Sequence, residues 1–183
     1  SSLKDWWRRW LFSRADGFLA YSSLSADHIR VMGSRKPIYI LGNNTMNCRS
    51  WHERVAHAGG AERGLKPIVL CIGQLIERKN YSLALKVFSR LSARGIVLPL
   101  ILVGSGPLER ALREQARDLG ITERIRFVGE ASHEELPNYF ARARVFLHPA
   151  RLDQWPQVIN EAMAPGLPII LSRSSGVPPD LAQ

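Results

Sequence analysis

The chain has 183 residues, of which 45% are hydrophobic and 22% are charged, and its formal net charge is +9. This balance indicates a globular protein of one to one and a half domains with a substantial core, and no apolar run approaches the roughly 20 residues that a membrane-spanning helix needs. Two cysteines, Cys48 and Cys71, are too few for a disulfide framework, and no secretory signal pattern is visible, so we expect a cytoplasmic protein.

The first residues combine tryptophan with basic side chains. On a helix, Trp6 or Trp7 and Trp10 would share one side with Leu11, with Arg8 and Arg9 flanking it. Two interpretations stay open: this stripe packs on the protein's own fold, or it lies at a membrane surface, with indoles at the headgroups and arginines on anionic lipid. We therefore expect either a packed helix or a peripheral membrane contact through residues 1–14. Positive charge alone does not select a nucleic-acid partner, and we expect none.

A short, incomplete α/β pattern follows. Residues 17–22 and 37–41 are predicted as two strands around a helix at 24–32. Because two strands are too few for a stable sheet, we interpret residues 1–46 as the tail of another domain whose beginning is absent. The next stretch is rich in Asn, Gly and Arg and is predicted to be a loop, with residues 47–66 as the linker to the main domain.

From residue 67 onward, strand and helix signals alternate. Continuous apolar runs predict strands buried on both faces, and apolar residues at helical spacing predict the helices between them. The strands are expected at 67–73, 98–103, 124–128, 144–148 and 168–171, and the helices at 80–94, at 107–119, after a capping box at Ser132–Glu135, and at 157–164. Five repeats predict an α/β fold with a doubly wound parallel sheet of order 3-2-1-4-5. Because the final Ser-, Gly- and Pro-rich loop has no closing element, we expect the domain at 67–183 to be truncated.

A sheet of this order places its ligand crevice at the carboxyl ends of strands 1 and 4. The loops there carry Lys79 and Asp153, with Glu161 at the start of the following helix and the glycine loop Gly104–Gly106 nearby. A lysine, a glycine loop and a helix start suit a diphosphate, whereas carboxylates accept hydrogen bonds from hydroxyl groups. Together they predict a nucleotide sugar, with Glu161 on a ribose and Asp153 on a hexose.

Each of these residues also has a purely structural interpretation. Lys79 alone is more often a solvated lysine at a helix start, Gly104 and Gly106 more often form a turn, and Asp153 fits a helix cap. Glu161 is the sharper signal, because an acid beside a buried helix face needs a partner. Their joint placement at one crevice favours a ligand site.

Four segments resemble, in order and spacing, those of the retaining GT-B glycosyltransferases of family GT4: Gly73–Lys79, Leu102–Leu108, Arg126–Gly129 and Asn160–Gly166. The family's E-x7-E motif falls on Asp153 and Glu161. The resemblance covers residues 14–183 and implies two facing Rossmann-like domains, with 67–183 as the donor-binding domain and 1–46 as the end of the acceptor domain. The hinge would lie near Gly42–Thr45.

The resemblance implies transfer of a hexose from a UDP- or GDP-sugar to a saccharide or lipid-linked acceptor in glycan biosynthesis, without a required metal ion. It implies that Glu161 binds the ribose hydroxyls, that Lys79 binds the donor phosphates, and that the base lies against the backbone of residues 128–130. No catalytic residue is placed in this chain, which is expected to lack full activity alone, and His148 is expected to pack at a strand end. The implied donor-binding residues are Gln74, Lys79, Gly104, Gly106, Val128, Glu130, Asp153, Trp155, Gln157, Val158 and Glu161.

Three positions depart from the family pattern. Asp153 is one methylene shorter than the usual glutamate, and Gln74 replaces an arginine. The segment 154–156 replaces Gly-Phe-Gly, and its proline removes one backbone donor, which leaves the amides of Gln157 and Val158. These departures leave the donor sugar open.

Three other classes of protein account for parts of the sequence pattern. A nicotinamide-binding domain is disfavoured, because Glu109 stands where the third glycine of its motif belongs. A UDP-sugar epimerase shares the GT-B architecture and stays as an alternative. A non-catalytic module that binds nucleotides, membranes or nucleic acid would rest on Trp6–Trp10, but the donor-site residues argue against it as the sole function.

Overall fold

The computed structural model describes residues 3–20, 22–40, 46–61, 64–96, 98–153 and 156–174. These residues form two compact units, one within the first 45 residues and one from residue 46 onward. Predictions that concern Gly42–Thr45, Gln154 and Trp155 lie outside the described residues.

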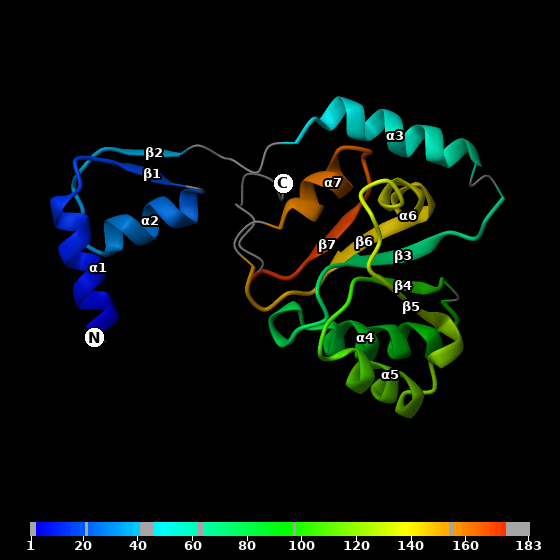
Figure 1. Cartoon of the computed structure of the whole chain (residues 1–183). Helices are drawn as coiled ribbons and strands as arrows, with labels where there is room; N and C mark the ends of the chain where they lie inside the picture. Colours follow the sequence, from blue (N-terminus) through cyan, green and yellow to red (C-terminus); the bar gives the residue numbers. More distant parts are fainter. Residues whose placement is uncertain are drawn as a thin grey trace. The chain divides into compact units, whose positions relative to one another are not determined.

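The first unit is a small parallel βαβ arrangement preceded by a helix (Figure 1). In chain order it contains α1 (Leu3–Arg14), β1 (Phe18–Ala20), α2 (Ser23–Val31) and β2 (Ile38–Ile40), and β1 pairs with β2 in parallel. Ser22 caps α2 by accepting a hydrogen bond from the Ser25 amide at 3.2 Å. The predicted strands and helix are therefore confirmed.

The second unit is built on a five-stranded parallel sheet. Its strands are β3 (Ile68–Ile72), β4 (Leu100–Val103), β5 (Ile125–Gly129), β6 (Ala143–His148) and β7 (Ile169–Leu171), in the order β5-β4-β3-β6-β7. Numbered within the domain this is 3-2-1-4-5, so the predicted doubly wound fold is confirmed. β3 and β4 are almost wholly buried, as their continuous apolar sequences require.

Helices cover both faces of this sheet (Figure 1). They are α4 (Tyr81–Ala93), α5 (Glu109–Asp118), α6 (Leu136–Arg142) and α7 (Gln157–Met163), with the short 3-10 turns η1 (Glu77–Lys79) and η2 (Thr122–Arg124). α4 and α5 pack their apolar stripes on β3 and β4, whereas α6 and α7 lie on the opposite face. The capping box forms, with the Glu135 amide donating to Ser132 Oγ at 3.3 Å and the Ser132 amide to Glu135 Oε2 at 2.8 Å.

The prediction of a loop at 47–66 was wrong. Most of this stretch is helix α3 (Cys48–Ala61), which belongs to the second unit. Asn47 caps it by accepting the Ser50 amide at 3.0 Å, and Trp51, Val55 and Ala58 are buried at helical spacing. Two consecutive glycines lower the intrinsic helix propensity of the segment, and tertiary burial of the apolar stripe outweighs that cost.

Candidate functional site

The site forms where two loops meet at the carboxyl ends of β3 and β6. The Arg151 amide donates to the Arg78 carbonyl at 2.8 Å, and Asn80 Nδ2 donates to the Pro149 carbonyl at 3.2 Å. Asn80 has a left-handed backbone, with φ 55° and ψ 39°, which turns the chain from η1 into α4. These bonds hold the two loops side by side, although their residues are about 70 positions apart in the sequence.

Asp153 is the centre of a charged cluster between these loops. Its Oδ2 accepts a short hydrogen bond from Lys79 Nζ and lies 3.2 Å from His148 Nε2, and its Oδ1 lies 3.4 Å from Arg78 Nη1. The side chains of Lys79 and Asp153 are each only 11% exposed. The predicted convergence of Lys79 and Asp153 is thus confirmed by direct contact.

The electrostatic environment keeps Asp153 ionised. Burial by itself would raise the pKa of Asp153, but the hydrogen bond and charge of Lys79, aided by His148 and Arg78, lower that pKa below its ordinary value of 3.8. The cluster is therefore a buried ion pair with an additional cation at its exposed side.

His148 has a role in this cluster that the sequence analysis missed. It is the last residue of β6, it is buried, and its ring stacks on Phe146 as expected for a strand end. Burial lowers the pKa of His148, and the charge of Lys79 lowers it further. A neutral imidazole that carries its proton on Nε2 donates this proton to Asp153. The sequence feature that could have indicated this role is the position of His148 at the carboxyl end of a central strand.

Glu161 lies in the first turns of α7 and is 8% exposed. Burial raises the pKa of its carboxyl group. Within the described ranges no hydrogen bond or ion pair reaches this carboxylate, so Glu161 is not a member of the ion pair of Lys79 and Asp153. Its predicted role on a ribose stays a prediction. Burial without a described counter-charge makes the ionised form of this carboxyl group costly.

Helix α3 holds the backbone of Glu161 in place through the side chain of Trp51. Trp51 Nε1 donates to the Glu161 carbonyl at 2.8 Å, across 110 residues of sequence. Trp51 is itself buried, and its ring stacks on His133 and meets Phe140 edge-on. Trp51 was not among the predicted site residues, because the segment that carries it was interpreted as a linker.

A profile of the Glycosyl transferases group 1 family matches residues 54–183, which include every residue of this cluster. The chain belongs to this family. The resemblance found in the sequence motifs is thereby confirmed at the level of the family.

One relative of this chain within the group 1 family is much longer than the chain itself. A GDP-mannose-dependent alpha-(1-6)-phosphatidylinositol monomannoside mannosyltransferase of Mycolicibacterium smegmatis is 34% identical over 122 residues, or 63% of this chain and 32% of the relative. The chain therefore spans about a third of that relative's length.

Two solved structures share the fold. Sucrose-phosphate synthase from Thermosynechococcus elongatus superposes with a TM-score of 0.75 and 24% identity, over 94% of this chain and 44% of the synthase. HepE of Anabaena in complex with UDP superposes with a TM-score of 0.70 and 19% identity, over 88% of this chain and 46% of HepE. The chain thus has the GT-B type of α/β fold that the motifs predicted.

The glycines of the group 1 motifs have a structural reason in this chain. A Cβ on Gly104 would lie 2.2 Å from the Gly73 carbonyl oxygen, and one on Gly106 would lie 2.6 Å from the Leu75 carbonyl oxygen. The Leu75 amide also donates to the Ser105 carbonyl at 2.8 Å. Glycine is thus needed where the loops after β3 and β4 touch, whether or not a ligand is bound.

The remaining predicted donor residues line the same edge of the sheet without joining the cluster. Gln74 and Gln157 are exposed, Val128 and Val158 are half-buried, and Glu130 is exposed. Ser105 Oγ donates to Glu130 Oε1 at 2.5 Å, which ties the loop after β4 to the end of β5. Their proposed roles remain predictions.

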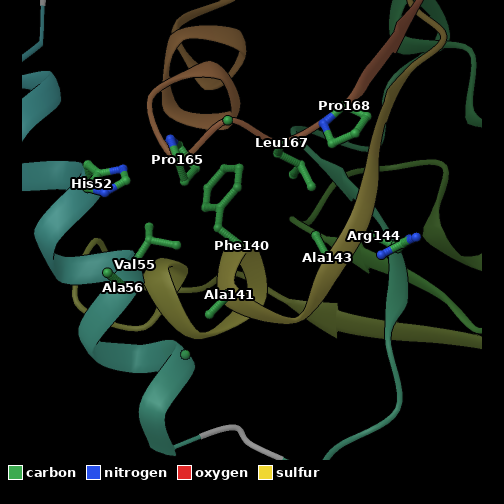
Figure 2. Close-up of a pocket in the computed structure, with 12 residues that line it drawn as sticks. His52, Val55, Ala56, Phe140, Ala141, Ala143, Arg144, Pro165, Leu167 and Pro168 are labelled. Carbon is green, nitrogen blue, oxygen red and sulfur yellow. The ribbon is translucent and has the colours of Figure 1, made fainter.

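A cavity of about 610 Å³ lies near the amino ends of β6 and β7, opposite the strand ends that carry the charged cluster. Figure 2 shows His52 and Val55 of α3 on one side, Pro168 and Arg144 on the other, and Phe140 between them. Arg144 is near the amino end of β6, and Pro168 immediately precedes β7. Since ligands of doubly wound sheets bind at the carboxyl ends of the strands, this cavity is separate from the predicted donor site.

Across the described ranges, no three His, Cys, Asp or Glu side chains are grouped so that they could hold a metal ion. In the same ranges, no helix has the length and apolar character to cross a membrane.

Proposed function

We propose that the chain is the donor-binding part of a retaining hexosyltransferase that uses a UDP- or GDP-sugar and a saccharide or lipid-linked acceptor. The observation that carries the proposal is the contact of Lys79 and His148 with Asp153 at the carboxyl ends of β3 and β6. That edge of a doubly wound sheet is where nucleotides bind. The relative named above is GDP-mannose-dependent, and HepE binds UDP, so a nucleoside diphosphate is the shared chemistry.

Each charged group has one role in this proposal. Lys79 and Arg78 contact the donor phosphates, whose negative charge they balance without a metal ion. Glu161 accepts hydrogen bonds from the ribose hydroxyls, and Asp153 accepts one from the hexose. The backbone of 128–130 lies against the base. A UDP-sugar epimerase would bind the same class of donor, but the match to the group 1 family favours transfer.

Nucleotide binding tests the proposal directly. Calorimetry with UDP, GDP and their hexose conjugates is expected to detect affinity for at least one of them. Glu161→Ala is expected to weaken that affinity by about 1–3 kcal/mol, the cost of losing hydrogen bonds to a charged group. Binding rather than turnover is the readout, because we do not expect this chain alone to assemble a closed site that excludes water.

Glu161→Gln supplies the control for folding. Because burial raises the pKa of Glu161, its contribution to stability is present below the ordinary value of 4.5 and is lost as pH rises through the raised pKa. The amide does not titrate, so the variant is expected to gain stability relative to the parent at neutral pH and to lose this advantage near pH 4.5. Unchanged nucleotide affinity in both variants would remove Glu161 from the site.

We further propose that α1 contacts an anionic membrane surface. Its ring-to-ring contacts join Trp6, Trp7 and Trp10, yet no residue of this helix is buried. Phe12 lies on the opposite side of the helix, at 100° per residue, and its ring meets Phe18 of β1 at 5.1 Å. The side of α1 that packs on its own unit is therefore not the side that carries the tryptophans.

Charge selects the partner of this surface. Helix α1 contains one acidic residue, Asp5, and four basic residues, Lys4, Arg8, Arg9 and Arg14. The Arg14 guanidinium lies 4.8 Å from the Trp10 ring centroid. Indoles favour the headgroup region, and each basic residue near an anionic surface contributes about 1 kcal/mol. Relatives that glycosylate a phosphatidylinositol acceptor make such a surface consistent with the proposed acceptor class.

Liposome flotation tests the membrane contact. The chain is expected to float with vesicles that contain phosphatidylglycerol, less so as salt rises, and less so after Trp6→Ala/Trp10→Ala. Arg8→Gln/Arg9→Gln should also reduce flotation, whereas the matched loss of charge in α5, Arg110→Gln/Arg117→Gln, should not. No flotation at low salt, or equal flotation with neutral vesicles, would contradict the proposal.

A further inference from the structure

Asp153 has three partners among the described residues, and they differ in how they would respond to a phosphate. Lys79 and Arg78 are cations on the loop after β3, and the guanidinium side chain is 47% exposed. A diphosphate attracts both of them. Burial and the charge of Lys79 lower the pKa of His148, which favours the neutral imidazole, and a neutral ring has no comparable attraction to phosphate.

His148 is also fixed in place more firmly than the two cations. Its side chain is 2% exposed, and its ring is nearly parallel to that of the fully buried Phe146, with a centroid distance of 6.3 Å. Its carbonyl accepts the Ser172 amide at 3.1 Å, and Ser172 Oγ donates to the Ala150 carbonyl. The imidazole thus projects from a rigid strand end, and Asp153 follows it by five residues.

We propose that His148 is a positioning residue that selects the sugar ring of the donor. Its Nε2 proton holds the Asp153 carboxylate in place while Lys79 turns to the phosphates, so that the free lone pairs of Asp153 face a hexose hydroxyl. This inference rests on the proposed function and extends it to sugar recognition. The geometry assigns the tautomer, because Nε2 faces a carboxylate oxygen that can only accept and must therefore carry the ring proton. The lowered pKa of His148 agrees with a neutral ring that donates this single proton.

The aspartate itself makes such a partner necessary. Asp153 stands one methylene short of the glutamate usual in the motif, so its carboxylate stays near the backbone of the loop. At 3.2 Å from the imidazole it is within hydrogen-bond reach of the strand end. Without that bond the carboxylate would move with Lys79 and Arg78 toward the phosphates, and its orientation toward the sugar would be lost.

The test compares two variants and four ligands. His148→Phe keeps a ring that can stack on Phe146 but removes the donor, and His148→Gln retains an N–H group near the position of Nε2. Calorimetry with UDP, UDP-glucose, GDP and GDP-mannose is expected to show about a tenfold loss of affinity for the preferred sugar nucleotide in His148→Phe, the cost of one hydrogen bond to a charged group. Affinity for the bare nucleoside diphosphate is expected to stay unchanged, and His148→Gln should recover most of the loss.

His133→Phe is the matched control, because it makes the same ring exchange at an exposed histidine that stacks on Trp51. Equal losses for nucleotide and sugar nucleotide in His148→Phe, or no loss in either, would overturn the inference while leaving nucleotide binding intact. Absence of binding by the parent chain to all four ligands would overturn the proposed function and this inference with it.

A second measurement covers the case in which His148→Phe does not fold. In ¹⁵N NMR spectra of the parent chain saturated with its sugar nucleotide, the His148 ring is expected to keep its proton on Nε2. A change to the tautomer protonated on Nδ1 would show that the bond to Asp153 is absent when the donor is bound, and would contradict the inference.

Discussion

Replacing Trp51 by alanine is expected to lower the free energy of unfolding of the second unit by about 3–5 kcal/mol. The side chain is 2% exposed and joins α3 to α6 through Phe140 and to α7 through the Glu161 carbonyl. The substitution removes a large apolar contact, leaves a cavity and exposes one buried carbonyl without its donor. Urea denaturation followed by circular dichroism measures the change.

Trp51→Phe separates packing from the hydrogen bond. It keeps an aromatic ring between His133 and Phe140 but cannot donate to Glu161, so a smaller loss of about 1–3 kcal/mol is expected. Trp10→Ala in α1 is the control, since that side chain is 40% exposed, and its effect should stay near zero. A loss below about 1 kcal/mol in Trp51→Ala would mean that α3 is not an integral part of the unit.

Asp153→Ala is expected to have an effect of similar size, again about 3–5 kcal/mol, because it leaves Lys79 buried without its counter-charge. Arg78 lies near the same place and adds a second positive charge. The double variant Lys79→Met/Asp153→Ala should regain much of this loss, since an apolar pair has no desolvated charge. A double-mutant cycle of Lys79→Met and Asp153→Ala measures the coupling energy between the two side chains.

The pH dependence of this effect has a fixed direction. Since the pKa of Asp153 is lowered in the folded chain, its contribution to stability is present above the ordinary value of 3.8 and is lost as pH falls through the lowered pKa. The difference between parent and Asp153→Ala should therefore shrink on acidification below about pH 4. A difference that is constant from pH 7 to pH 3 would exclude the ion pair as its source.

Local patterns were sufficient for the parallel sheet of the second unit and for the helices that follow its strands. The apolar runs of β3 and β4 and the helical stripes of α4 and α5 are short-range signals, and the handedness of crossovers leaves few ways to arrange them. Strand order then placed Lys79 and Asp153 at one edge of the sheet, and the structure brings them into contact. This much of the candidate site followed from the sequence, because topology alone decides which strand ends are neighbours.

Tertiary structure alone decided the remaining features. Helix α3 has two glycines in its last turn, and the burial of Trp51 against α6 and α7 outweighs their poor helix propensity. No local sequence pattern indicates which segments Trp51 contacts. The bond from His148 to Asp153 likewise depends on the angle at which the strand end meets the next loop. Gly104 and Gly106 looked like ligand contacts, but the close approach of the neighbouring backbone already requires them. Sequence periodicity determines which residues face inward, whereas the contacts of individual side chains depend on packing between segments distant in the chain.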